Sequence, residues 1–228
     1  MSDKAFYLSK TEFGVLASLG GSKKLYCFDL NMQEGLEREE LIQSIYQIVK
    51  NDWGSLNDQG MELCGTMKEL IDDVVRAETL LDVEGAEERS LCYLGGQAVS
   101  LTAVPDGMLR AGGLLYDELL SWIEETLTLG KPFWNTEEEA LEETRSNEAV
   151  EQERQALEEG RWKTASRKGE ILLRNAGDGS VTERFLFVQG VLNLWLIQVK
   201  EDGEVIRITP DSAEERQRLQ KRWEELSR

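Results

Sequence analysis

The stretch "LCYLGGQAVSLTAVPDGMLR", residues 91–110, gives the clearest indication of the fold, because it holds two strand patterns joined by Gly-Gly and a third strand after Asp-Gly. A passage with the same layout, "FLFVQGVLNLWLIQVKEDGEVIR", occupies residues 185–207. Turns that need positive backbone φ angles join antiparallel neighbours and favour glycine. Both stretches therefore predict an antiparallel β-meander.

The turn signals around the two stretches correspond in order and spacing. Those of the first half are Glu84-Gly85, Gly95-Gly96 and Asp106-Gly107, and their counterparts Asp178-Gly179, Gln189-Gly190 and Asp202-Gly203 follow 94, 94 and 96 residues later. Each series then enters a helix, at Asp117 and at Asp211, again 94 residues apart. The agreement predicts an internal repeat over residues 79–128 and 170–227, each copy a meander followed by a helix. The poor side-chain identity between the halves keeps open the alternative that unrelated meanders share their turn spacing.

The N-terminal part predicts helices. In "LSKTEF" Ser9 can cap a helix and Glu12 can reach back to its amide, so we expect a short helix that ends at Leu19, followed by a strand in "KKLYCFDL". Two apolar stripes then predict two packed helices. The first stripe is Leu41, Ile42, Ile45, Ile48 and Val49, and the second is Met61, Cys64, Met67, Ile71 and Val74.

These elements predict a mixed α+β fold of two pseudo-symmetric halves, each an antiparallel β-meander packed with helices. We divide the chain into residues 1–130 (N-terminal helices, meander and helix), 131–160 and 161–228 (second meander and terminal helix). Residues 131–160 are rich in acidic side chains and poor in apolar ones. The segment is therefore either a solvated helix held at a few points or a flexible connector.

The charge balance excludes several classes of partner. With 44 acidic and 26 basic residues, the formal net charge of −18 repels nucleic acid and anionic lipid. The chain has no run of 18 apolar residues, and its start lacks an apolar core preceded by basic residues. We expect no nucleic-acid binding, no membrane insertion and no export by the signal-peptide route.

The residue types also argue against catalysis. The chain has no histidine and no C-x-x-C spacing, so the usual zinc ligands and the usual acid/base side chain are missing. Cys27, Cys64 and Cys92 lie far apart in apolar segments, as reduced cysteines of a cytoplasmic protein do. Neither "LGGQ" nor "RAGG" has the pattern of a phosphate-binding loop. We expect no enzyme, no metal site and no cofactor.

Two places can bind a protein partner. In "VLNLWLIQV" both faces of the strand are apolar, and one of them carries Val191, Trp195, Ile197 and Val199. The alternative, that helices of the chain bury this face, is the one we favour. The aromatic pair Phe133 and Trp134 follows a helix end at Gly130, and loop aromatics often anchor interfaces. Here the alternative is that the pair folds back onto the core.

The order of elements resembles the EspG-like accessory proteins of type VII (ESX) secretion. The resemblance lies in "FYLSKTEFGVLASLG", in "GSLNDQGMELCGTMKELIDDVVRAETLLDVEG" and in "CYLGGQAVSLTA". It implies a cytosolic chaperone with pseudo-twofold α/β architecture that holds a helical export substrate, and it implies no catalytic residues.

We therefore expect a cytoplasmic, non-catalytic binding protein whose partner is a protein. The first interpretation is a type VII secretion chaperone with a helical substrate. Acidic type III secretion chaperones are the nearest alternative within this class. Outside it, the alternative is an immunity protein that blocks a toxin with its acidic surface. The sequence leaves the oligomeric state open.

Overall fold

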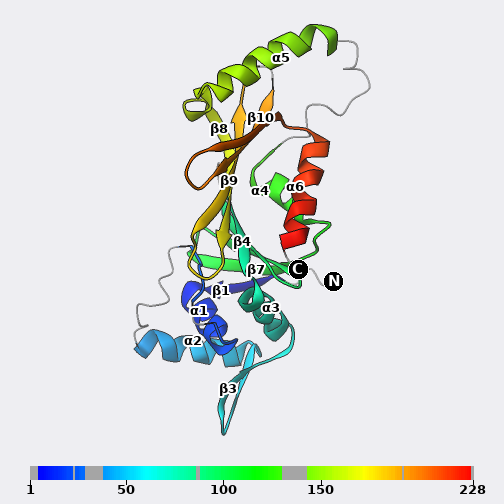
Figure 1. The fold of residues 1–228 in the computed structure, drawn as a ribbon. Coiled ribbons are helices and arrows are strands. Elements are labelled where there is room, and N and C mark those ends of the chain that lie inside the picture. Colours follow the sequence, from blue (N-terminus) through cyan, green and yellow to red (C-terminus); the bar gives the residue numbers. More distant parts are fainter. Residues whose placement is uncertain are drawn as a thin grey trace.

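A nine-stranded antiparallel sheet runs through the whole computed structural model, which describes residues 5–22, 24–28, 38–85, 88–129, 143–191 and 193–226. Its order is β1-β7-β6-β5-β4-β8-β9-β10-β11 (Figure 1). The strands are β1 (Phe6–Ser9), β4 (Thr79–Glu84), β5 (Arg89–Leu94), β6 (Ala98–Ala103), β7 (Met108–Leu114), β8 (Ser166–Asn175), β9 (Val181–Gln189), β10 (Leu194–Lys200) and β11 (Val205–Pro210).

The two meanders extend in opposite directions from the centre of this sheet. There β4 pairs antiparallel with β8, with Leu81 opposite Leu173. Strands β4 to β7 follow one another outward on one side, and β8 to β11 do the same on the other side. Each meander is followed by a helix, α4 (Leu119–Thr126) in the first half and α6 (Ala213–Leu226) in the second. The predicted fold class, mixed α+β with an antiparallel meander and helices in each half, is confirmed, and the internal repeat of residues 79–128 and 170–227 stays a prediction.

The predicted turns lie between the strands for which they were expected. The Asp-Gly turns β6–β7 and β10–β11 have Gly107 at φ 82° and Gly203 at φ 87°. This left-handed backbone costs glycine little, because glycine has no Cβ to clash with the carbonyl oxygen. In both turns the aspartate carboxylate accepts a hydrogen bond from the amide two residues later, at 3.0 Å. The local chemistry that marks these turns in the sequence is thus the chemistry that closes them.

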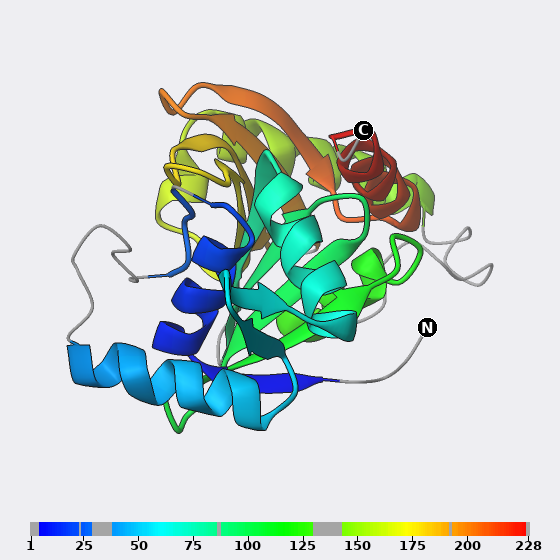
Figure 2. The ribbon, with the colours of Figure 1, turned by 90° about the horizontal axis from the view of Figure 1, so that it is seen from below.

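Helices cover both faces of the sheet (Figures 1 and 2). On one face, α4 and α6 pack together over both halves, with Trp223 of α6 against Phe185 of β9. On the opposite face, α1 (Lys10–Leu19) and α3 (Gly65–Arg76) cover the first half. The second half of that face packs against α5 (Glu143–Glu158) and the short 3₁₀ helix η2 (Arg161–Lys163).

The N-terminal predictions are partly confirmed. The capping box at Ser9 is present: its hydroxyl accepts from the amide of Glu12, whose carboxylate accepts from the amide of Ser9. The residues before it form β1, a strand that we did not predict. The strand expected in residues 23–30 is wrong for the described residues 24–28, where Cys27 makes a single bridge. There the amide of Tyr26 donates instead to the carbonyl of Ala176, in the β8–β9 turn.

The second apolar stripe was assigned to one helix and is divided in the structure. Met61 belongs to a hairpin of β2 (Gly54–Asn57) and β3 (Gly60–Leu63), and α3 begins only at Gly65. Met61 and Cys64 are three residues apart, and this spacing occurs both within a helix and where a strand leads into a helix. The spacing therefore could not distinguish these two structures. The hairpin projects from the end of the molecule (Figure 1). Both α3 and the other predicted helix, α2 (Arg38–Lys50), pack against α1.

None of the helices within the described residues has the length and apolar character that a membrane span needs.

Candidate protein-binding surfaces

The structure places Trp195 and Ile197 in the core of the second half. Both side chains are 0% exposed on β10, in a cluster with Leu157 of α5 and Trp162 of η2. The favoured alternative, burial of this face by helices of the chain, is what the structure shows. A partner contact at these two residues stays a prediction that requires α5 to move away. Phe133 and Trp134 lie outside the described residues.

Helix α5 covers this face with few apolar contacts. Its described side chains contribute Leu157, which is buried, and Val150, which is partly buried, to the cluster on β10. Most of its other side chains are charged or polar, among them an ion-paired arginine, Arg154, with Glu151 and Glu158. Residues 143–158 of the acidic segment thus form a solvated helix held at a few points, one of the two alternatives that the sequence left open.

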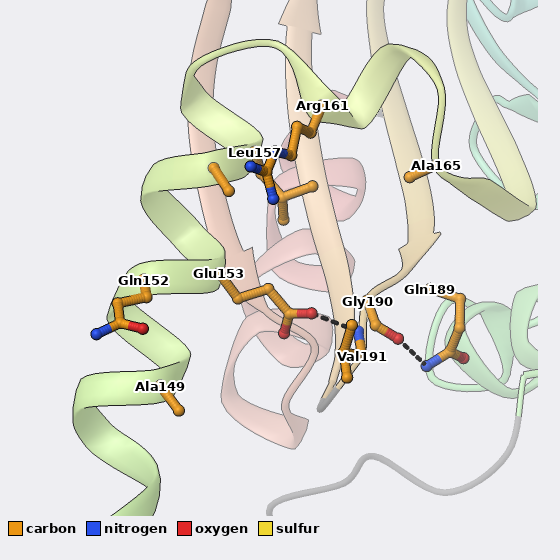
Figure 3. Close-up of a pocket in the computed structure, with 10 residues that line it drawn as sticks. Ala149, Gln152, Glu153, Leu157, Arg161, Ala165, Gln189, Gly190 and Val191 are labelled. Atoms are coloured by element: carbon orange, nitrogen blue, oxygen red, sulfur yellow. Dashed lines mark hydrogen bonds between the residues drawn. The ribbon is translucent and has the colours of Figure 1, made fainter.

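A single carboxylate connects α5 to the β9–β10 turn. Glu153 accepts a hydrogen bond from the indole Nε1 of Trp195 at 2.9 Å. It accepts another from the amide of Val191 (Figure 3). A Cβ on Gly190 would lie 2.4 Å from Glu153 Oε1 and 2.8 Å from the Trp195 indole nitrogen. Only glycine at residue 190 therefore allows this approach between helix and turn. The sequence predicted Gly190 as a turn residue but contained no signal for its carboxylate partner.

An open groove of about 530 Å³ lies between α5 and this turn (Figure 3). Apolar and polar side chains both line it: Ala149, Gln152, Glu153, Ala156, Leu157, Arg161, Ala165, Gln189, Gly190 and Val191. Val191 was predicted to share the buried face of Trp195, and this is wrong. Strand β10 begins at Leu194, so Val191 belongs to the turn, where it is 93% exposed. An exposed valine side chain in a turn beside a groove is a suitable contact for a partner.

Other exposed apolar side chains lie on the N-terminal elements. Leu56 of the β2–β3 hairpin is 64% exposed. On α2, Ile42 and Tyr46 are 56% and 63% exposed, although Ile42 was predicted on the packed face. The packed face consists of Ser44 and Ile48, with Ile45 partly buried. The first stripe was therefore wider than the surface that α1 covers.

The buried charges serve the architecture. Asp82 of β4 is 1% exposed and accepts from Arg89 of β5 at 2.8 and 2.9 Å and from Arg174 of β8 at 2.8 Å. Burial, and then the charge of Asp82, raises the pKa of the neighbouring Tyr26. This network joins the two halves at the central strand pair. In α6, Arg216 pairs with Asp211 and with Glu124 of α4, and so connects the helices of the two halves.

Two of the cysteines, Cys27 and Cys92, are buried and not suited to nucleophilic chemistry. Burial raises the pKa of the Cys27 thiol to about 12, and it raises that of the fully buried Cys92 further. A thiol with so high a pKa is not ionised near neutral pH, and the thiolate is the reactive form. Within the described residues no cluster of three or more cysteine or carboxylate side chains has the geometry of a metal site.

Comparison with known proteins supports the fold. No protein-family model and no curated protein sequence matches the chain. Among solved structures, it is similar to the Mycobacterium tuberculosis type VII secretion system chaperone EspG5, determined in complex with the PE25-PPE41 dimer. The match has a TM-score of 0.54 and 11% sequence identity, and it covers 96% of this chain and 95% of that chain. At this identity the match shows a shared fold along nearly the whole of both chains.

Proposed function

We propose that this chain is a cytosolic, non-catalytic chaperone of the type VII secretion kind, which binds a helical protein substrate. The observation that carries the proposal is the fold shared, over almost the full length of both chains, with a type VII chaperone solved together with a protein dimer. The net charge of −18 is consistent with this role, because like charge keeps a complex with a sticky partner dispersed.

The groove beside α5 is the surface to which we assign the substrate. Its helix side carries Ala149 and Ala156, seven residues apart and thus on one face of α5. Small side chains at this spacing let a second helix approach closely, and the exposed Val191 offers apolar contact at the margin formed by the turn. A helix of the substrate would pack against this face of α5.

The test is capture of a helical partner encoded near this protein's gene. Co-expression should give a stable complex, and Val191→Asp should weaken it by about tenfold or more, since a charge would enter the apolar contact. The matched control is Leu115→Asp, which alters an apolar residue 39% exposed and outside the groove. Both variants should melt as the unmodified protein does, because neither side chain belongs to the core.

Two results would contradict the proposal. Capture of a toxin domain whose activity is then blocked would favour the immunity alternative. Steady turnover of a substrate by the purified protein, abolished by one carboxylate substitution, would show an enzyme.

A further inference from the structure

The outward face of α2 carries a second apolar surface, separate from the groove. The helix packs against α1 through Ser44 and Ile48, and on the side away from this contact Ile42 and Tyr46 are more than half exposed. Ordinary surface helices present polar side chains there. Ile42 and Tyr46 lie four residues apart, so they are neighbours on the helix surface.

Charges of opposite sign stand at the two ends of this face. Glu39 precedes Ile42 by three residues, and Lys50 follows Tyr46 by four, so all four side chains lie along one stripe. All four are exposed. An antiparallel copy of the helix, related by a twofold axis near residue 44, places Ile42 against Tyr46 and Glu39 against Lys50 of the second copy. The stripe is thus complementary to itself in charge and in the position of its apolar side chains, as a twofold interface requires.

A hollow beside the stripe can accept the largest of these side chains. It has a volume of about 530 Å³, and polar side chains line most of it, among them Ser9 and Glu12 at the start of α1 and Glu40 and Gln47 of α2; Ile42 and Tyr46 form its apolar margin. The twofold arrangement brings the Tyr46 ring of each copy to the Ile42 margin of this hollow on the other copy. Filling it would bury part of the exposed surface of two tyrosine rings and place their hydroxyl groups among polar side chains.

We propose that this protein forms a homodimer through antiparallel pairing of α2 with α2 of a second copy. Each chain carries a net charge of −18, so the copies repel at long range. That repulsion is screened beyond about 8 Å at physiological salt, whereas the Glu39–Lys50 pairs act at contact. The dimer therefore forms near physiological ionic strength and weakens at low salt. The inference goes beyond the proposed function, because it needs no substrate.

Sedimentation equilibrium of the full chain measures the pairing directly. We expect a concentration-dependent dimer, and Tyr46→Ala or Ile42→Ala should weaken it by about tenfold or more, because each substitution removes two contacts across the twofold axis. Leu56→Ala is the matched control, since Leu56 is equally exposed on another element and should leave the dimer unchanged.

Charge reversal tests the antiparallel geometry. Glu39→Lys alone and Lys50→Glu alone should each weaken the dimer, because each sets like charges opposite one another. The double variant should restore it. Each reversal is unfavourable to the helix dipole, because it places a positive charge at the N-terminus of α2 or a negative charge at its C-terminus. The double variant therefore has the least stable α2, so a dimer that it recovers cannot result from a more stable helix.

Three outcomes would overturn the proposal: a monomer at every concentration, a dimer that neither single reversal changes, or a double variant no stronger than the single ones. A substrate complex that depends on Tyr46 while the free chain remains monomeric would also overturn it, and would assign the stripe to the substrate. If Val191→Asp does not weaken a substrate complex, or no substrate is captured, the sedimentation measurements on the free chain are unaffected. The dimer proposal and the substrate proposal can therefore fail independently.

Discussion

Removal of the Trp195 indole tests whether α5 is part of the folded core or only rests on it. The side chain is completely buried between β10 and the α5–η2 segment, and its Nε1 donates to Glu153 at 2.9 Å. Trp195→Ala should lower the free energy of unfolding by about 3–5 kcal/mol, the usual cost of removing a large buried aromatic side chain. A domain of ordinary stability has only about 5–15 kcal/mol, so this is a large fraction of the total.

The hydrogen bond can be separated from the packing. Trp195→Phe keeps an aromatic ring and removes the donor, at a cost of about 1.5–3 kcal/mol because the acceptor is charged. Glu153→Ala removes the acceptor. If the two groups interact as the structure shows, the double variant should lose less than the sum of the two single losses, by about 0.5–3 kcal/mol.

Urea unfolding followed by circular dichroism measures these values, and Leu56→Ala is the control, because it shortens an exposed side chain outside both proposed binding surfaces. A Trp195→Ala protein that unfolds at the urea concentration of the unmodified protein would refute the buried position. Strict additivity of Trp195→Phe and Glu153→Ala would refute the link between α5 and β10.

Three further predictions concern the buried polar and thiol groups. Asp82→Asn should destabilise the fold by about 3–5 kcal/mol in urea unfolding, because two arginines lose their buried counter-charge, and a loss under about 1 kcal/mol would contradict the role of this network. In the folded protein a thiol reagent should modify Cys64 rapidly, and Cys27 and Cys92 only after unfolding, since the last two are fully buried; three equally fast thiols would be the opposite result. In the folded protein the pKa of Cys27 is about 12, above its ordinary value of 9.0. The stability contributed by this thiol is therefore complete below pH 9 and is lost as the pH rises toward 12, by at most about 1.4 kcal/mol per pH unit. In urea unfolding, Cys27→Ala should make the decline of stability at alkaline pH less steep.

The sequence alone predicted the local chain path correctly at the turns and at the start of α1, where a specific side-chain-to-backbone signal acts on its own. Asp106-Gly107 and Asp202-Gly203 define turns because the aspartate side chain bonds to the turn backbone and glycine accepts a positive φ. Ser9 and Glu12 define a helix start for a similar reason. Strands of matching spacing between such turns predict two meanders, and the pairing of neighbouring strands follows directly.

Where two local signals coincide, the prediction failed. The apolar residues from Met61 onward suit a strand followed by a helix as well as one continuous helix. The stripe at Leu41–Val49 was read as one packed face, but α1 covers only part of it, and Ile42 is exposed.

Which apolar surface is covered, and by what, was decided only in three dimensions. Alternation along β10 makes both of its faces apolar, so the burial of Trp195 depended on α5, a helix about 40 residues away in the chain with few apolar side chains of its own. No periodicity in α5 indicates that its Glu153 carboxylate meets an indole and a turn amide, or that a groove remains beside Val191. A local sequence pattern reflects the conformational preferences of a few consecutive residues. Burial instead reflects the free energy gained when distant segments exclude water together, and that gain depends on how the segments pack in space.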